Sequence, residues 1–161
     1  MIRGVLLVTV LSACAHQQPP RPGPARAFTV GHFALGEPAG CARKVVFELA
    51  DVASGTRTPA SLCLRVIPDA PEGTWFWIEG LVEAALPEGK LVVEQRIRAN
   101  DFDPEGAGRA MRVALWDGKV DGARSEGVYR GRGGRLYGGG KLFFDVEKGA
   151  RAEVVLVLDV Q

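Results

Sequence analysis

Hydrophobic and polar residues alternate with a period of two over most of the chain beyond residue 28. This alternation puts every second side chain on one face of an extended strand and is typical of a sheet with one buried side. The alternating runs are KVVFELA (44–50), SLCLRVI (61–67), TWFWIEGLVEA (74–84), KLVVEQRIRA (90–99), AMRVALW (110–116), KLFFDVE (141–147) and RAEVVLVLDVQ (151–161). About eight strands are therefore expected, each with its apolar face turned toward a core.

The alternation also predicts which side chains face the core, in sets of three residues from one strand. These sets are Val45, Phe47 and Leu49; Leu62, Leu64 and Val66; Leu91, Val93 and Ile97; and Met111, Val113 and Leu115. Residues that favour turns separate the runs. The turn signals are Pro87 with Gly89, Asp117-Gly118, Asp121-Gly122 and Lys148-Gly149.

The fold class follows from these strands and turns. The full chain holds 21 glycines, and only LVEAALPEG (81–89) is compatible with a turn of helix. Many strand-like runs with glycine-rich connections favour an all-β domain over residues 28–161. We expect an antiparallel β-sandwich, with a small β-barrel as the alternative. The strand order does not follow from the pattern.

The beginning of the chain has a different pattern. Arg3 is followed by an uncharged run from Gly4 to Leu11 and then by Ser12, Ala13 and Cys14. A basic residue before a short apolar run is typical of a secretory signal peptide, and this run is too short to span a bilayer as a helix. The alternatives are an ordinary cleaved signal in which Cys14 has no role, or a start codon placed too far downstream.

The residues Leu11-Ser12-Ala13-Cys14 resemble the lipobox of bacterial lipoproteins. This resemblance implies a signal peptide over residues 1–13, cleavage before Cys14, a diacylglycerol on the Cys14 sulfur and acylation of the new amino terminus. Two or more acyl chains hold a protein stably at a membrane without a transmembrane helix. Ala15, in place of Asp after the cysteine, implies the outer membrane in the sorting rule of enteric-type lipoproteins. The resemblance ends at Cys14, and no family is recognised for the folded domain.

A proline-rich segment, AHQQPPRPGPARA (15–27), follows the cysteine. It cannot bury enough apolar surface to fold and is expected to be an extended tether over residues 14–27, with His16 in solvent. At ~3.1 Å per residue, such a tether reaches roughly 40 Å. The expected domain therefore stands away from the lipid.

The remaining cysteines complete this prediction. If Cys14 carries lipid, Cys41 and Cys63 are an even pair in an exported, oxidising setting and are expected to form a disulfide. A reactive thiol or a metal pair is less favoured, because no other ligand type clusters with them.

Charge excludes one class of partner. Removal of the signal takes Arg3 from the 20 basic residues and leaves 19 basic against 19 acidic side chains, so no general attraction to nucleic acid follows. The charges are segregated, since residues 69–105 hold nine acidic and three basic side chains and residues 107–141 hold eight basic and three acidic. They either pair across strands or form surfaces for an envelope protein, an anionic glycan or lipid head groups.

Catalytic motifs are missing from the sequence of the expected domain. His32 is its only histidine, and Ser54, Ser61 and Ser125 are its only serines. No G-x-S-x-G motif surrounds these serines, which argues against a hydrolase, and one histidine with two cysteines is a poor zinc set. No catalytic residue and no cofactor other than the covalent lipid are predicted.

One acidic stretch is a weak metal candidate. Asp101, Asp103 and Glu105 before Gly106 imitate the start of a calcium loop. Arg112 stands where such a loop needs a bidentate glutamate. A solvated loop between strands is the favoured interpretation.

The stretch YRGRGGRLYGGGK (129–141) is the candidate interaction surface. Its candidate contact residues are Arg130, Arg132, Arg135, Tyr137 and Lys141. It lacks the Walker A pattern, and its local structure is expected to be a long glycine-rich hairpin or a bulged edge strand. Trp75 and Trp77 share one strand face and are further surface candidates, although burial is the expected fate of most aromatic residues.

Together these observations predict a lipid-anchored protein of the bacterial envelope, placed at the outer membrane and facing the periplasm. Its domain is expected to be a non-enzymatic interaction or assembly module with an envelope protein as partner. The alternative is a lipoprotein that binds a small molecule, a glycan or a metal.

Overall fold

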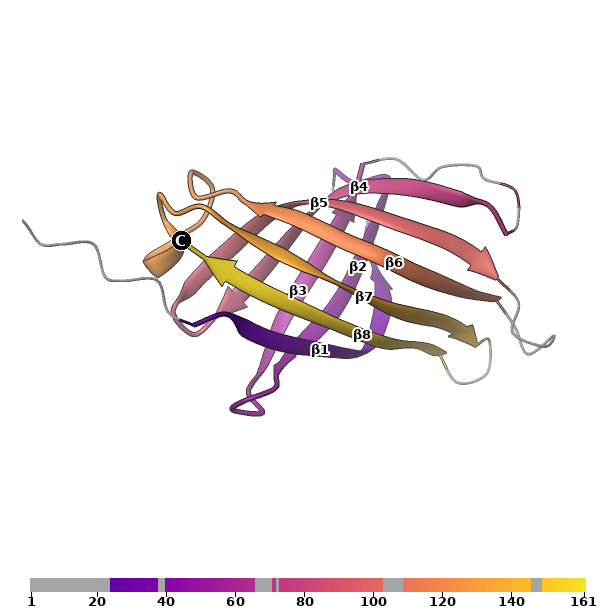
Figure 1. Ribbon diagram of the computed structural model, residues 1–161, viewed down its shortest axis with the longest axis horizontal. Helices are drawn as coiled ribbons and strands as arrows, with labels where there is room; N and C mark the ends of the chain where they lie inside the picture. Colours follow the sequence, from indigo (N-terminus) through magenta and orange to yellow (C-terminus); the bar gives the residue numbers. More distant parts are fainter. Residues whose placement is uncertain (1–23, 38–39, 66–70, 72, 103–108, 146–148) are drawn as a thin grey trace, which may run out of the picture.

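Eight antiparallel strands form a closed barrel in the computed structural model, which describes residues 24–37, 40–65, 71, 73–102, 109–145 and 149–161 (Figure 1). The strands are β1 (Arg26–Gly36), β2 (Arg43–Asp51), β3 (Arg57–Leu64), β4 (Trp75–Leu86), β5 (Gly89–Phe102), β6 (Arg109–Val120), β7 (Gly134–Asp145) and β8 (Gly149–Val160). Each strand pairs with the next along the chain, and β8 pairs with β1. A short 3₁₀ helix, η1 (Gly127–Tyr129), lies between β6 and β7.

The all-β prediction is confirmed, but the sandwich is wrong and the barrel named as its alternative is observed. In a sandwich the strands belong to two sheets with free edges, whereas here β1 has β2 on one side and β8 on the other. Alternation requires only that one face of each strand is buried, and both architectures meet that requirement. The choice between them depends on the pairing of β1 with β8, which joins the two ends of the described chain.

The inside of the barrel is filled by apolar side chains, as the alternation predicted. Residues on the inner face from all eight strands form one continuous core, including Phe28, Phe47, Leu62, Val82, Val93, Val113, Leu136 and Leu156. Leu115 is the exception among the predicted core residues, with 40% of its surface exposed. The β6–β7 register shifts between Val113 and Trp116, so Trp116 faces the core in its place. Val66 lies outside the described residues.

Irregular positions also explain the other local differences from prediction. No run was predicted over β1, where register shifts around Val30 and His32 interrupt the alternation. The segment 81–89 holds the end of β4 and a tight turn rather than helix, and Gly89 has a φ of 147° that suits glycine. Asp117-Gly118 is not a turn, because both residues pair with β5 inside β6. Asp121-Gly122 does lie in a turn after β6, while Lys148 lies outside the described residues.

A partly exposed ion network lies at the end of the barrel at which β1 begins. The Arg26 guanidinium binds Asp51 at 2.8 Å and Glu88 at 3.1 Å, and the Tyr129 hydroxyl donates to Glu88 at 3.2 Å. Asp51 also accepts backbone N–H bonds from Ala53 and Ser54, each at 2.9 Å. The network joins β1, β2, the β4–β5 turn and η1. Figure 1 shows that the carboxyl end of the chain lies at this same end of the barrel.

The free energy of unfolding is expected to fall between about pH 4 and pH 2 through Asp51. The Ser54 backbone N–H and the Arg26 guanidinium lower the pKa of Asp51 to about 2. The unfolded carboxyl takes up its proton near its ordinary pKa of about 3.9, so the stabilisation is complete above that pH and is lost as the pH falls toward 2. Urea unfolding between pH 5 and pH 2 measures this loss. Asp51→Asn should show a flatter pH dependence, and equal slopes for the two proteins would contradict the assignment.

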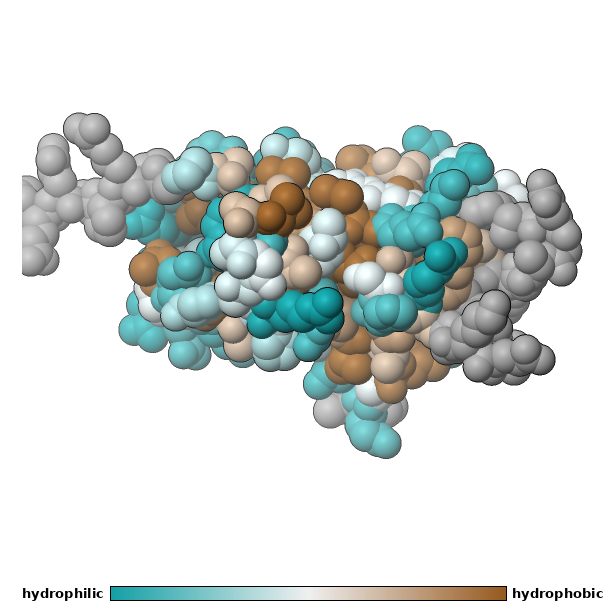
Figure 2. Space-filling model, turned by 90° about the horizontal axis from the view of Figure 1, so that it is seen from below, coloured by the Kyte–Doolittle hydropathy of each residue, from teal (hydrophilic) through white to brown (hydrophobic). Residues whose placement is uncertain are grey.

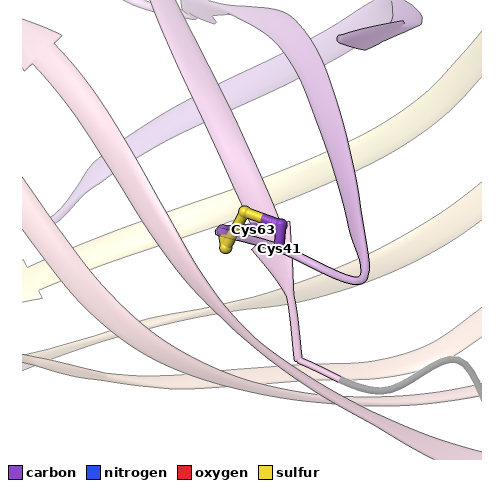
Figure 3. Close-up of a disulfide and its surroundings, with 2 residues drawn as sticks. All are labelled: Cys41 and Cys63. Atoms are coloured by element: carbon purple, nitrogen blue, oxygen red, sulfur yellow. A yellow bond between two sulfur atoms is a disulfide. The ribbon is translucent and has the colours of Figure 1, made fainter. Parts of the chain in front are cut away.

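The predicted disulfide is confirmed. Cys41 and Cys63 are bonded, with their Cα atoms 5.3 Å apart (Figure 3). Cys63 lies on β3, and Cys41 lies two residues before the start of β2. Antiparallel pairing of β2 with β3 brings the two segments together at the end of the barrel opposite to the Arg26 network.

Candidate functional site

Two exposed tryptophans on β4 are each covered by an arginine of β5. Trp75 and Trp77 point outward, because Phe76 and Ile78, their neighbours along the strand, face the core. The exposed fractions of the two tryptophans are 42% and 40%. The Arg98 guanidinium lies 5.1 Å from the ring centre of Trp75, and that of Arg96 lies 4.2 Å from the ring centre of Trp77. Such cation–π pairs contribute about 0.5–1 kcal/mol at exposed sites. They hold both guanidinium groups in place on the surface.

This surface extends across β6 and β7. Register places Arg98 opposite Leu115, and it places Arg112 opposite both Asn100 and Lys141. Leu115 is exposed because of the β6 irregularity, and Arg112 and Lys141 are exposed at outward positions. We call this set the Arg–Trp surface, and it comprises Trp75, Trp77, Arg96, Arg98, Asn100, Arg112, Leu115 and Lys141. It combines aromatic area with basic charge, which is the composition that dominates binding surfaces.

A charged groove of about 630 Å³ adjoins the Arg–Trp surface. Its lining comes mainly from β4, β5, β6 and β7 and comprises Arg65, Glu79, Gly80, Glu94, Gln95, Arg96, Asp117, Gly118, Lys119, Gly134, Arg135 and Gln161. Most of its charges pair with one another, since Arg135 binds Asp117 at 2.6 Å and Glu94 binds Arg124 at 2.8 Å and Arg65 at 3.5 Å. In this region, therefore, the segregated charges of the sequence meet across the strands.

The predicted interaction residues do not form one cluster. Arg130 and Arg132 lie in the β6–β7 connection, whereas Arg135, Tyr137 and Lys141 lie along β7. Arg135 lies in the groove, with its guanidinium 5.8 Å from the Tyr137 ring centre, and Lys141 belongs to the Arg–Trp surface. The expected edge strand is corrected, because β7 pairs with β6 and β8 on its two sides.

Buried polar groups of the barrel interior form a second notable cluster. Gln95 and Trp116 face the core from neighbouring strands, and neither the Gln95 amide atoms nor Trp116 Nε1 has a hydrogen-bond partner within the part of the chain that the structure describes. A Cβ at Gly118 would lie 2.2 Å from Gln95 Nε2, so the glycine makes room for this amide. Unpartnered buried polar groups cost about 1–3 kcal/mol each.

The remaining predicted site residues have other positions. His32 is exposed on β1, and Ser125 is buried, where its Oγ accepts the Val92 N–H at 3.0 Å and donates to the Asp121 carbonyl at 2.7 Å. Asp101 lies on β5, while Asp103, Glu105 and Cys14 lie outside the described residues. Within the described ranges, no group of three or more His, Cys, Asp or Glu side chains could hold a metal ion. No helix among those residues is long and apolar enough to cross a membrane.

Other parts of the outer surface differ from the Arg–Trp surface. The face in Figure 2, seen from below Figure 1, mixes hydrophobic and hydrophilic residues. The exposed large hydrophobic residues of β1, β2 and β8 are aliphatic, namely Leu35, Val46 and Val155.

The sequence matches no protein-family model, and no curated protein or solved structure is significantly similar to it.

Proposed function

We propose that this protein is a lipid-anchored lipoprotein of the bacterial envelope whose barrel is a non-enzymatic binding module. In this proposal Cys14 carries the lipid, the part of the proline-rich segment before β1 is the tether, and the Arg–Trp surface contacts a component of the envelope. The Arg–Trp surface carries the proposal, because two large aromatic side chains remain exposed on β4, whose other aromatic residue, Phe76, packs against the core. Exposed tryptophan beside arginine is typical of residues that contribute most of the energy of an interface.

The packed interior supports an outer binding surface. The side chains of Phe28, Phe47, Trp116 and Leu156 belong to one core inside the barrel. An eight-stranded barrel has an interior that side chains can fill or that can hold one small ligand. Here apolar side chains from every strand occupy it.

A ligand inside the barrel is the second candidate, and the unpartnered atoms of Gln95 and Trp116 favour it. A small apolar molecule with one polar group would satisfy these atoms. Native mass spectrometry of the purified protein tests this candidate through the mass of a non-covalent adduct. An adduct that persists in wild type and disappears in Gln95→Met would show that the ligand binds inside the barrel and would favour the interior over the outer surface as the functional site.

Cell fractionation combined with crosslinking tests the proposed function. A photo-crosslinking amino acid at position 115 should give an adduct in intact cells, and one at position 52 should not, because Val52 is exposed in the β2–β3 turn, away from the Arg–Trp surface. Cys14→Ala should remove the acyl mass, release the protein from the membrane fraction or block its processing, and weaken the adduct at position 115.

Two outcomes would each contradict one part of the proposal. An unacylated wild-type protein in the soluble fraction would remove the anchor. Equal adducts at positions 115 and 52 would remove the Arg–Trp surface as the contact site.

A further inference from the structure

We propose that the Arg–Trp surface binds an anionic polysaccharide, whose carboxylate groups bind the guanidinium groups and whose hydroxyl groups supply hydrogen-bond donors. This inference rests on the proposed function and names the class of envelope component. Four features carry it: unneutralised charge, fixed guanidinium groups, their spacing and an unpartnered buried oxygen.

The charge on this surface is poorly neutralised. Arg98 and Lys141 have no carboxylate within ion-pair distance among the residues that the structure describes, and the nearest carboxylate to Arg96 is Glu79 at 3.9 Å. Lys141 stands opposite Arg112 on β6 and opposite Glu153 on β8. A bound anion would neutralise the Arg98 guanidinium, whereas the charges of the adjoining groove already pair with one another.

Contact with the indole rings prepares the guanidinium groups for anions. A guanidinium presents pairs of N–H donors that match the two oxygens of a carboxylate. The Trp75 and Trp77 rings restrict Arg98 and Arg96 before any ligand arrives. Less side-chain entropy is then lost on binding.

The spacing of the basic groups favours a polymer. Arg96 and Arg98 are two residues apart on one face of β5 and are therefore separated by roughly 6.7 Å along the strand. Arg112 and Lys141 add charges on the next two strands, each about 4.8 Å farther across the sheet. A chain of repeated anionic units can bind several of these groups at once, which a single small anion cannot do.

Asn100 distinguishes a polysaccharide from other polyanions. Its side chain lies on the outward face between Trp75 and Arg112, and only 9% of the residue is exposed. Its Oδ1 has no hydrogen-bond partner among the described residues. An amide oxygen needs a donor, which a sugar hydroxyl supplies and an ionised carboxylate or phosphodiester does not. Because this oxygen is buried, a donor reaches it only when neighbouring side chains move.

The same rings are poorly suited to insertion into a bilayer. Guanidinium groups cover Trp75 and Trp77, and interfacial binding depends on free apolar area together with charge. Polysaccharide is therefore the favoured ligand, and binding to an anionic membrane is an outcome of the test.

Calorimetric titration with polygalacturonate tests the inference, with neutral dextran as the reference polymer. The protein is the chain from residue 14 with Cys14→Ser, which contains the whole barrel and its core. This protein, whose Arg–Trp surface is unchanged, should bind polygalacturonate and not dextran, and added salt should weaken the binding. Arg98→Ala with Lys141→Ala should weaken it about tenfold or more. Arg57→Ala is the matched control, because Arg57 is an exposed arginine of β3 outside the Arg–Trp surface.

The outcomes separate this inference from the proposed function. Equal binding to both polymers, or equal loss in Arg57→Ala and the double variant, overturns it. So does binding to phosphatidylglycerol vesicles without binding to polygalacturonate. A protein adduct at position 115 in cells, combined with no polysaccharide binding, leaves the proposed function in place and overturns only the choice of ligand. Unchanged thermal midpoints of the variants show that the barrel is intact.

Discussion

Replacement of Phe28 by alanine is expected to lower the free energy of unfolding by about 3–5 kcal/mol. Phe28 is 1% exposed and lies on β1, where it pairs with Asp51 of β2 and Leu156 of β8. The Arg26 guanidinium lies 5.1 Å from its ring centre. Alanine would leave a cavity where the pairing of β1 with β8 closes the barrel. It would also remove the ring that contacts Arg26 of the ion network. Urea denaturation at neutral pH measures the change.

Thr29→Ala is the control for Phe28→Ala. Thr29 is the next residue of β1 and is exposed on the outer face, so its replacement should change the free energy of unfolding by no more than about 0.5 kcal/mol. Similar losses in the two variants would contradict the assignment of residue 28 to the core and residue 29 to the surface.

Removal of the disulfide by Cys41→Ser with Cys63→Ser is expected to cost about 3 kcal/mol of unfolding free energy. The bond joins residues separated by 22 positions, and the two halves of this loop belong to the segments that pair as β2 and β3. Without the bond the unfolded chain gains conformational freedom, and the folded barrel does not. Denaturation of the double variant beside the wild type measures the difference.

A reducing agent provides the control for the disulfide prediction. Reduced wild type should lose as much stability as the double variant, and the variant itself should not respond to the reagent. A stable, fully reduced wild type would show that the bond contributes little to this barrel.

Much of the fold could be predicted from alternation alone, because a period of two fixes which side chains share a face. Val45, Phe47 and Leu49 face the core for this reason. The choice of barrel over sandwich could not be predicted, because the pairing of β1 with β8 joins segments at opposite ends of the described chain. Local register shifts could not be predicted either, and one such shift leaves Leu115 exposed and Trp116 buried.

The candidate surface was only partly predictable. The shared face of Trp75 and Trp77 is a property of the sequence, but their exposure depends on whether Phe76 and Ile78 face inward. The arginines that cover the two rings come from β5 and are found only once the β4–β5 register is known. Arg130 and Lys141 are close in sequence, and yet a connecting segment and a strand separate their positions.

The Arg26 network has a mechanical consequence. A pull on the chain before β1 arrives at Arg26, the first residue of the first strand. Because this side chain is bound to Asp51 of β2 and to Glu88 of the β4–β5 turn, the load is divided among three segments. Tension that would otherwise peel β1 from β8 one hydrogen bond at a time must first break two ion pairs. A barrel held in this way resists force at the point where a tether would apply it.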